Sequence, residues 1–387
     1  MNTLSLNDIL KKYKIKKPEL VLHYIVISGE IPNELFRLLG ISRNSQNYII
    51  NQSKILKGKN YLLSKKGNNL YGYQLSIKGT RYMANNDNYL PYLTSNQDFI
   101  HTTNDLFKRI RYRRTALLYY YLDKFNIDYF NVKDTNKENC FISSKFLKNI
   151  FHMEKRQPDT EYEIIGSKFF GLLSLENEKY LTYMFGDSLN TLYYGMEERT
   201  KFIIENKFNI KKTGTLIFFN SFIGLKKVFI NVFYSIINEN NNQKFNDIKY
   251  SFFKNIDFND YFSVSFCSMD EKGDTQFNYI KQKKFNHKKI VEALNLYTNY
   301  LEEGEQAQKY KSDFMLNGYP VIILCDLDLS KVLNIYNRVH YSEDEYICYR
   351  IICYDFQREL LKIVFRPIKD NIIFYDIKKI LDFGKQN

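Results

Sequence analysis

Apolar and polar positions in the first hundred residues follow the period of helices and then that of strands. Apolar residues at helical spacing predict one helix over Pro18–Ser28, with proline tolerated in its opening turn, and a second over Ile31–Leu39. Gly40 ends the second helix, and Ser42 is placed as the N-cap of a third. Two helices joined by so short a link are typical of a helix-turn-helix.

A strand pattern follows the third helix. Tyr61–Ser64 and Leu70–Leu75 flank the basic, glycine-containing segment Lys65–Asn69, which predicts a hairpin with a tip suited to lie along phosphates. The next run, Leu75–Gly79, resembles the LTxKG sequence that closes the wing in many bacterial winged-helix proteins. This order of elements predicts an N-terminal winged helix-turn-helix domain over residues 1–100.

The third predicted helix has two different faces. Asn44, Asn47, Asn51 and Lys54 recur at spacings of three and four and share one face, whereas Ile49 lies on the other. Amide and basic side chains read adenine and guanine edges in the major groove, so the polar face is a candidate for base readout. The alternative is a winged helix used for protein contacts, with these side chains solvated.

A basic helix is predicted next, over Asn104–Phe125. Lys108–Arg114 places five cations in seven residues. They cannot all share one helix face, so two interpretations stay open: contact with DNA phosphates, and ion pairs with a neighbouring element. Residues 101–140 are interpreted as this helix and a linker.

Short apolar runs alternate with amphipathic helices over residues 141–387. The predicted strands are Thr215–Phe219, Tyr261–Cys267, Val321–Asp326, Tyr346–Tyr354 and Asn371–Tyr375. Such alternation favours a mixed α/β domain, so the fold class expected for the whole chain is α+β.

Charge distinguishes the N-terminal third from the rest. Residues 1–124 hold 20 Lys and Arg against 8 Asp and Glu, whereas the remainder holds 36 against 35. So uneven a distribution indicates an anionic partner for the N-terminal part, and with the helices above it predicts double-stranded DNA. The predicted DNA-binding residues are Arg43, Asn44, Gln46, Asn47, Asn51, Lys54, Lys57, Lys65, Lys66, Arg109, Arg111, Arg113 and Arg114.

Other features narrow the class of protein. Five cysteines without paired spacing indicate reduced thiols, and the polar segment Leu4–Lys17 is unlike a signal peptide, so we expect a cytoplasmic protein. The longest apolar stretch, Thr215–Ile237, is interrupted by polar residues, so no membrane partner is expected. Nucleotide-binding glycine motifs and metal-ligand spacings are missing, so we expect no cofactor, no metal and no catalytic residue.

A metal-dependent nuclease is the enzymatic alternative. Such enzymes often hold Mg²⁺ between carboxylates, with a lysine two positions after one of them to place the attacking water. Asp376 and Lys378 have this spacing after an apolar strand, with Asp355, or Asp326 and Asp328, as partners.

Three stretches in the middle of the chain resemble the replication–relaxation family, carried by plasmids and conjugative elements of Firmicutes. They are Arg109–Asn126, Cys140–Ile150 and Ile165–Thr200. Within the last stretch, Ser167–Leu173 is similar to an SR-x-x-G-x-L strand, Tyr183–Gly186 to a VYNTG sequence, and Glu198–Thr200 to an E-x-RT helix. Departures from the family pattern are Lys168 for Arg, Phe185-Gly186 for Asn-Thr, and the lack of tryptophan.

The resemblance implies a winged helix followed by a mixed α/β domain distantly like a restriction endonuclease, here without an intact nuclease site. Our leading hypothesis is a sequence-specific, non-enzymatic DNA-binding protein of a mobile genetic element, acting in plasmid replication or transfer. Alternatives are the nuclease or nicking enzyme and a transcriptional repressor of its own element. Candidate partners besides DNA are a second copy of the chain and a replication or transfer protein.

Overall fold

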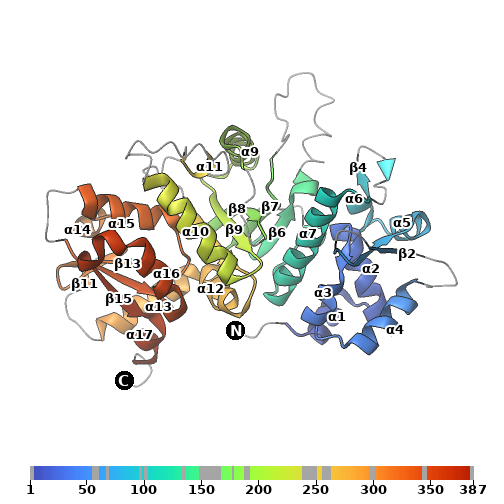
Figure 1. Ribbon diagram of the computed structural model, residues 1–387, viewed down its shortest axis with the longest axis horizontal. Coiled ribbons are helices and arrows are strands. Elements are labelled where there is room, and N and C mark those ends of the chain that lie inside the picture. Colours follow the sequence, from blue (N-terminus) through green and yellow to red (C-terminus); the bar gives the residue numbers. More distant parts are fainter. Residues whose placement is uncertain are drawn as a thin grey trace. The chain divides into compact units, whose positions relative to one another are not determined.

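The computed structural model describes most of the chain (Figure 1). The described residues exclude 1–3, 55–60, 67–68, 96–97, 100–102, 133, 135, 148–166, 177, 187–191, 238–250, 255–262, 297–300, 303, 342–346 and 384–387. The fold is mixed α+β, as expected from the sequence. Internal contacts divide it into two compact units, one of residues 1–164 with 170–174 and one of residues 165–169 with 175–387.

The first unit is mainly helical and carries the blue to green colours of Figure 1. Its helices are α1 (Leu6–Tyr13), α2 (Lys17–Ser28), α3 (Asn33–Leu38), α4 (Arg43–Lys54), α5 (Ile77–Ala84), α6 (Leu90–Leu93) and α7 (Leu106–Lys124). Its strands are β1 (Ile31–Pro32), β2 (Leu62–Lys65), β3 (Gly72–Leu75), β4 (Thr94–Ser95), β5 (Asp98–Phe99), β6 (Cys140–Ser143) and β7 (Gly171–Leu175).

A small antiparallel sheet with strand order β1-β3-β2 follows the chain path helix, strand, helix, helix, hairpin. Leu62 pairs with Leu75 across the hairpin, and Ile31 pairs with Tyr73. The predicted helix over Ile31–Leu39 therefore begins two residues later, because Ile31 and Pro32 form a strand with a distant partner. Helix α2 is buried from Leu20 to Ser28 and packs against α4 and α7, as expected of a helix with apolar residues on all sides of this stretch.

The carboxylate of Glu30 lies buried between three elements of this unit. Arg109 of α7 donates from Nε to Oε2 and from a terminal nitrogen to Oε1, both at 2.8 Å. Gln74 of β3 donates to Oε2, also at 2.8 Å, and Arg113 lies 3.5 Å from Oε1. The Arg109–Glu30 ion pair joins α7 to the sheet. It is bidentate, because two N–H groups of the guanidinium match the two oxygens of the carboxylate.

A second buried carboxylate, Asp123 near the end of α7, gathers three tyrosine hydroxyls. Tyr13 and Tyr129 donate to it at 2.6 Å and Tyr24 at 2.8 Å, while Lys12 lies 3.4 Å away. Burial raises the pKa of the Asp123 carboxyl, although the lysine and the hydroxyls oppose this shift. The network ties α1 and α2 to α7.

His23 of α2 lies in the same interior, with its side chain fully buried. Its Nδ1 is 3.0 Å from the hydroxyl of Tyr89, and its Nε2 is 3.4 Å from that of Tyr129. Because the Tyr129 hydroxyl already donates to Asp123, it can only accept from Nε2–H, so Nε2 carries a proton and Nδ1 can accept from the Tyr89 hydroxyl. Burial, followed by the charge of Lys12, lowers the pKa of His23 from 6.5 to about 3.

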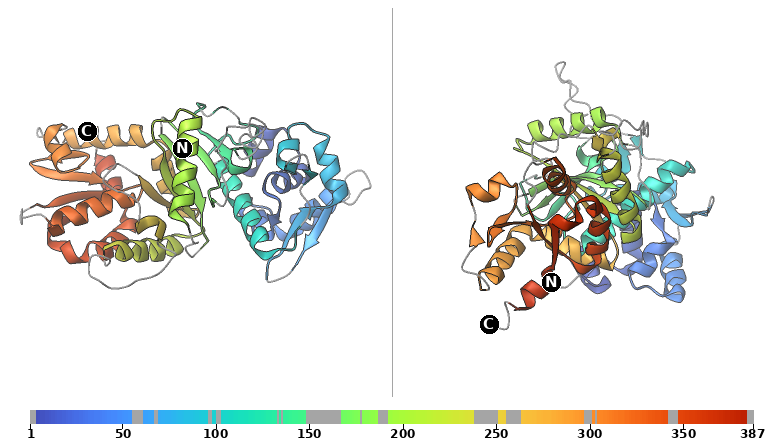
Figure 2. Two further views of the ribbon diagram at one scale, coloured as in Figure 1. Left: turned by 90° about the horizontal axis from the view of Figure 1, so that it is seen from above. Right: turned by 60° about the vertical axis from the view of Figure 1, so that its left-hand side comes forward.

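The second unit alternates strands and helices (Figure 2). Its strands are β8 (Glu178–Met184), β9 (Gly214–Phe219), β10 (Val264–Ser268), β11 (Leu301–Glu302), β12 (Phe314–Leu316), β13 (Tyr319–Ile323), β14 (Tyr349–Cys353) and β15 (Ile372–Asp376). Its helices are α9 (Tyr194–Lys207), α10 (Phe222–Ile237), α11 (Ser251–Lys254), α12 (Glu271–Lys281), α13 (Lys283–Asn295), α14 (Glu305–Lys309), α15 (Leu329–Tyr341), α16 (Asp355–Val364), the 3₁₀ helix Arg366–Asn371 and α17 (Ile377–Phe383).

Parallel strands dominate this unit. Strands β8, β9 and β10 are parallel neighbours, and β13, β14 and β15 form a second parallel set extended by antiparallel β12 and β11. Helices α15 and α16 make the crossovers between the strands of the second set. Thr215–Phe219 is buried throughout, which explains why the sequence shows an unbroken apolar run rather than alternation. Among the described residues, no helix is both long and apolar enough to cross a bilayer.

Glu30→Gln tests the buried ion pair. The amide leaves Arg109 charged, buried and without its carboxylate, so we expect a loss of about 3–5 kcal/mol in the free energy of unfolding. Glu34→Gln is the matched control, because Glu34 lies 3.6 Å from Arg113 on the surface, and we expect it to cost less than about 1 kcal/mol. Urea denaturation measures the free energy of unfolding of both variants. An equally small loss in both would contradict a stabilising role for the Glu30–Arg109 pair.

His23→Gln tests the pH dependence. Unfolded His23 takes up a proton near pH 6.5 whereas folded His23 does so only near 3, so stability is complete above pH 6.5 and falls as the pH drops through that window. Between pH 7 and 5, the native sequence should lose about 2 kcal/mol more than the variant. His340 is exposed, so His340→Gln should keep the native dependence of the free energy of unfolding on pH. Parallel curves of this free energy against pH for the native protein and His23→Gln would refute the role given to buried His23.

Candidate nucleic-acid interface

The turn between α3 and α4 is tight and depends on Gly40. This residue has a φ of +71°, a left-handed conformation that glycine adopts without strain. The amide of Ile41 returns to the carbonyl of Phe36 at 2.9 Å, and buried Ile41 holds the turn against the core. The link between α3 and α4 is short, as predicted, and consists of the four residues Leu39–Ser42.

Helix α4 begins at Arg43, directly after its predicted cap. The amide of Ser45 donates to Oγ of Ser42 at 3.3 Å, which satisfies one of the free amides of the first turn. Ile49 and Ile50 are buried at 3% and 5% exposure and anchor one face of the helix. The direction of this face determines which side chains reach solvent.

The opposite face of α4 is polar and exposed. Asn44, Asn47 and Asn51 are exposed together with Arg43, while Gln46 is half-buried. The backbone of Lys54 ends the helix, and Lys57 lies outside the described residues. The predicted amide face therefore lies on the surface, as base readout requires.

Sequence reasoning missed one member of this face, Tyr48. Its side chain is 66% exposed, although tyrosine is usually more buried. It stands four residues after Asn44 and three before Asn51, so helical spacing places it in the same stripe. Helical spacing is the signal that identifies it, although its side chain is neither an amide nor basic.

The β2–β3 hairpin carries the two lysines predicted for the wing. Lys66 is exposed, whereas Lys65 is half-buried and its Nζ donates to Oδ1 of Asn104 at 2.8 Å. Gly72 lies opposite Lys65, at a point where a Cβ would come 2.7 Å from both Oε1 of Glu30 and the Ile31 carbonyl. The hairpin thus packs directly against the buried ion pair.

The contacts of the basic helix α7 favour ion pairs over phosphate contacts for two of its arginines. Arg109 is 4% exposed and bonded to Glu30, and Arg113 donates to the Tyr71 carbonyl at 2.8 Å and pairs with Glu30 and Glu34. For Arg109 and Arg113 this corrects the predicted phosphate contact, because their guanidinium groups are turned inward by carboxylates. The guanidinium of Arg111 lies 5.3 Å from the centre of the Phe170 ring, and both Arg111 and Arg114 are half-buried.

The residues of the nuclease alternative follow neighbouring parallel strands. Asp376 ends β15, with Oδ1 accepting the Lys378 amide at 3.1 Å, and Asp355 begins α16 after β14 and pairs with Arg358 at 3.3 Å. Asp326 follows β13 and lies 3.0 Å from Lys283. Within the described ranges, no three His, Cys, Asp or Glu side chains come together as metal ligands, so the nuclease hypothesis gains no support from geometry.

Comparison with protein-family models gives no match for this chain. Comparisons with curated proteins and with solved structures give no match either. The resemblance to the replication–relaxation family therefore stays a prediction.

Proposed function

We propose that residues 1–100 of the first unit form a winged helix-turn-helix domain that binds double-stranded DNA with α4 in the major groove. The observation that carries this proposal is the exposed face of α4, where Arg43, Asn44, Asn47, Tyr48 and Asn51 share one surface beside a tight turn. Asparagine can donate to and accept from adenine at the same time, whereas arginine can donate two hydrogen bonds to guanine.

The rest of the unit supports the proposal. The path helix, β1, helix, turn, helix, hairpin and the strand order β1-β3-β2 match what a winged helix needs to present a recognition helix and a wing. Exposed Lys66 near the hairpin tip is suited to a phosphate contact. The positive balance of residues 1–124 supplies the long-range attraction to a polyanion.

The biological setting is part of the proposal. The resemblance described above favours sequence-specific binding in the replication or transfer of a mobile element, with a second copy of the chain reading a paired half-site. A repressor of its own element would use the same surface. Whether the bound site overlaps an origin or a promoter distinguishes the two roles.

Fluorescence anisotropy with duplexes tiled across the protein's own genetic neighbourhood tests the proposal. We expect one duplex to bind tightly, and Asn47→Ala to weaken it by about 1–3 kcal/mol with little effect on other duplexes. Lys66→Ala should weaken all duplexes alike and reduce the slope of log K against log salt by about 1.

Lys227→Ala is the matched control, because Lys227 is an exposed lysine of α10 in the second unit. It should leave both affinity and salt slope unchanged. Equal weak affinity for every duplex, unaffected by Asn47→Ala, would refute sequence-specific readout. A complete lack of DNA binding would favour a winged helix used for protein contacts.

A further inference from the structure

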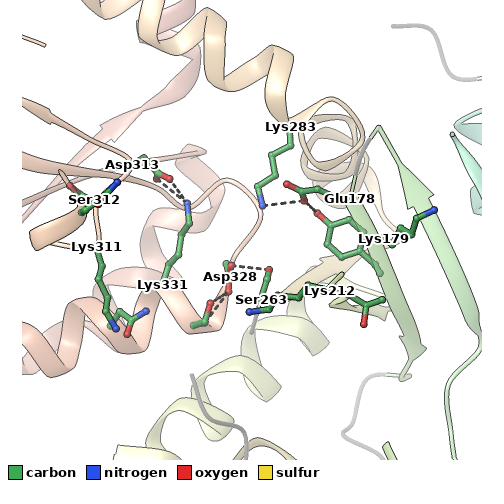
Figure 3. Close-up of a pocket in the computed structure, with 16 residues that line it drawn as sticks. Glu178, Lys179, Lys212, Ser263, Lys283, Lys311, Ser312, Asp313, Asp328 and Lys331 are labelled. Atoms are coloured by element: carbon green, nitrogen blue, oxygen red, sulfur yellow. Dashed lines mark hydrogen bonds and ion pairs between the residues drawn. The ribbon is translucent and has the colours of Figure 1, made fainter. Parts of the chain in front are cut away.

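The second unit contains a polar cavity of about 490 Å³ (Figure 3). Its walls come from the starts of β8 and β9, the residue before β10, the first turns of α13 and α15, and the segment that leads into β12. A volume of this size accommodates a small molecule. All the lining residues belong to the second unit, so the cavity is independent of the candidate nucleic-acid interface.

Lysines outnumber carboxylates in the lining. The carboxylates are Glu178, Asp313 and Asp328, and the lysines are Lys179, Lys212, Lys283, Lys311 and Lys331. The lining residues therefore carry two more positive than negative charges, and Asp326, which pairs with Lys283 behind the lining, reduces this excess to one. In a confined space such an excess favours an anionic ligand.

The carboxylates are engaged within the protein. Asp328 accepts from Ser263 at 2.9 Å and from the Ser330 amide at 2.9 Å, which caps the start of α15. Asp313 accepts the Ile323 amide and Lys331, both through Oδ2, at 2.7 and 2.9 Å. These acids fix the walls of the cavity, so a cationic ligand would have to displace their existing partners.

Two lysines enter the cavity from opposite sides, each held by an acid (Figure 3). Lys283 lies 3.0 Å from Asp326 and 3.6 Å from Glu178, and Lys331 lies 2.7 Å from Asp313. Burial disfavours the charge on Lys283, but the neighbouring carboxylates outweigh it and raise the pKa of Lys283 well above its ordinary value. Both ammonium groups are thus charged and fixed in place. Lys331 directs its donors to both oxygens of Asp313 and to the Ile323 carbonyl, whereas Lys283, with two carboxylate partners, keeps a donor for a ligand.

Two serine hydroxyls in the lining indicate which groups, besides an anionic one, the ligand carries. Ser263 donates its proton to Asp328, and Ser312 donates to the Ala307 carbonyl at 3.1 Å. A hydroxyl has one proton, so towards the cavity these two oxygens can only accept. Tyr180, the one aromatic residue in the lining, is 2% exposed and offers no ring face for a base to stack on.

We propose that this cavity binds a small phosphorylated polyol such as a sugar phosphate. The lysines receive the phosphate, since an ammonium group is a good point-charge partner for it. The hydroxyls of the ligand donate to Ser263 and Ser312. Ligand binding in this cavity does not depend on the DNA binding proposed for the first unit.

Isothermal titration of the full-length protein tests the proposal with ribose 5-phosphate, ribose, inorganic phosphate and citrate. We expect ribose 5-phosphate to bind most tightly, phosphate more weakly, and ribose and citrate not measurably. Lys212→Gln/Lys311→Gln should weaken ribose 5-phosphate at least about tenfold, because both lysines line the cavity and are exposed enough to be replaced without disturbing the core.

Lys227→Gln/Lys369→Gln is the control, with two exposed lysines of the same unit outside the lining. It should bind ribose 5-phosphate like the native protein, and so should Lys65→Ala/Lys66→Ala in the first unit. If the double cavity variant does not fold, Lys212→Gln and Lys311→Gln are measured singly.

Three results would overturn the proposal. They are no heat of binding with ribose 5-phosphate, equal affinity for citrate or for ribose, and binding that survives the cavity variants but is lost with Lys65→Ala/Lys66→Ala. The last result would place the anion on the DNA-binding surface. Because the DNA experiment reads α4 and the wing, failure of either proposal leaves the other standing.

Discussion

The buried carboxylate of Glu30 determines how the helices and the hairpin of the first unit are held together. It receives Arg109 from α7, Gln74 from β3 and the side of Gly72, where there is no room for a Cβ. A charge without solvent needs such partners, because an unpaired buried ion is strongly destabilising. The constraint positions β1 and the hairpin, and β1 leads directly into α3 and the turn that presents α4. The polar face of α4 is thus held by an interaction between side chains that never touch it.

Paired charges serve a different purpose in the second unit. Lys283 and Lys331 line a cavity, and their ion pairs with Asp326 and Asp313 keep the two ammonium groups charged in a partly desolvated place. In the first unit the carboxylate turns two arginines away from solvent. In the second, the acids hold lysines at the edge of an open space. Burial alone therefore does not decide whether a charged side chain serves only the fold. That depends on whether the charged group also borders an open space.

Local patterns predicted much of this structure. Spacing of three and four identified the polar face of α4, and Ser42 and Gly40 indicated its start and the preceding turn. Apolar runs located β9, β10, β13, β14 and β15. The role of Arg109 was not predictable in this way, because its partner Glu30 is 79 residues away and no local pattern links them. Ile31 was assigned to a helix for the same reason, since its strand partner is Tyr73. The cavity joins residues from 178 to 334, and only the tertiary fold brings them together.

We expect the exposed face of α4 to contact duplex DNA. Site-specific photocrosslinking tests it most directly, with Tyr48 replaced by p-azidophenylalanine and Phe202 of α9 replaced in the same way as the control. Both are exposed aromatic residues, at 66% and 59%, so size and accessibility are matched. We expect the preferred duplex to crosslink at position 48 and not at position 202. Crosslinking at 202 alone, or equally at both positions, would contradict it.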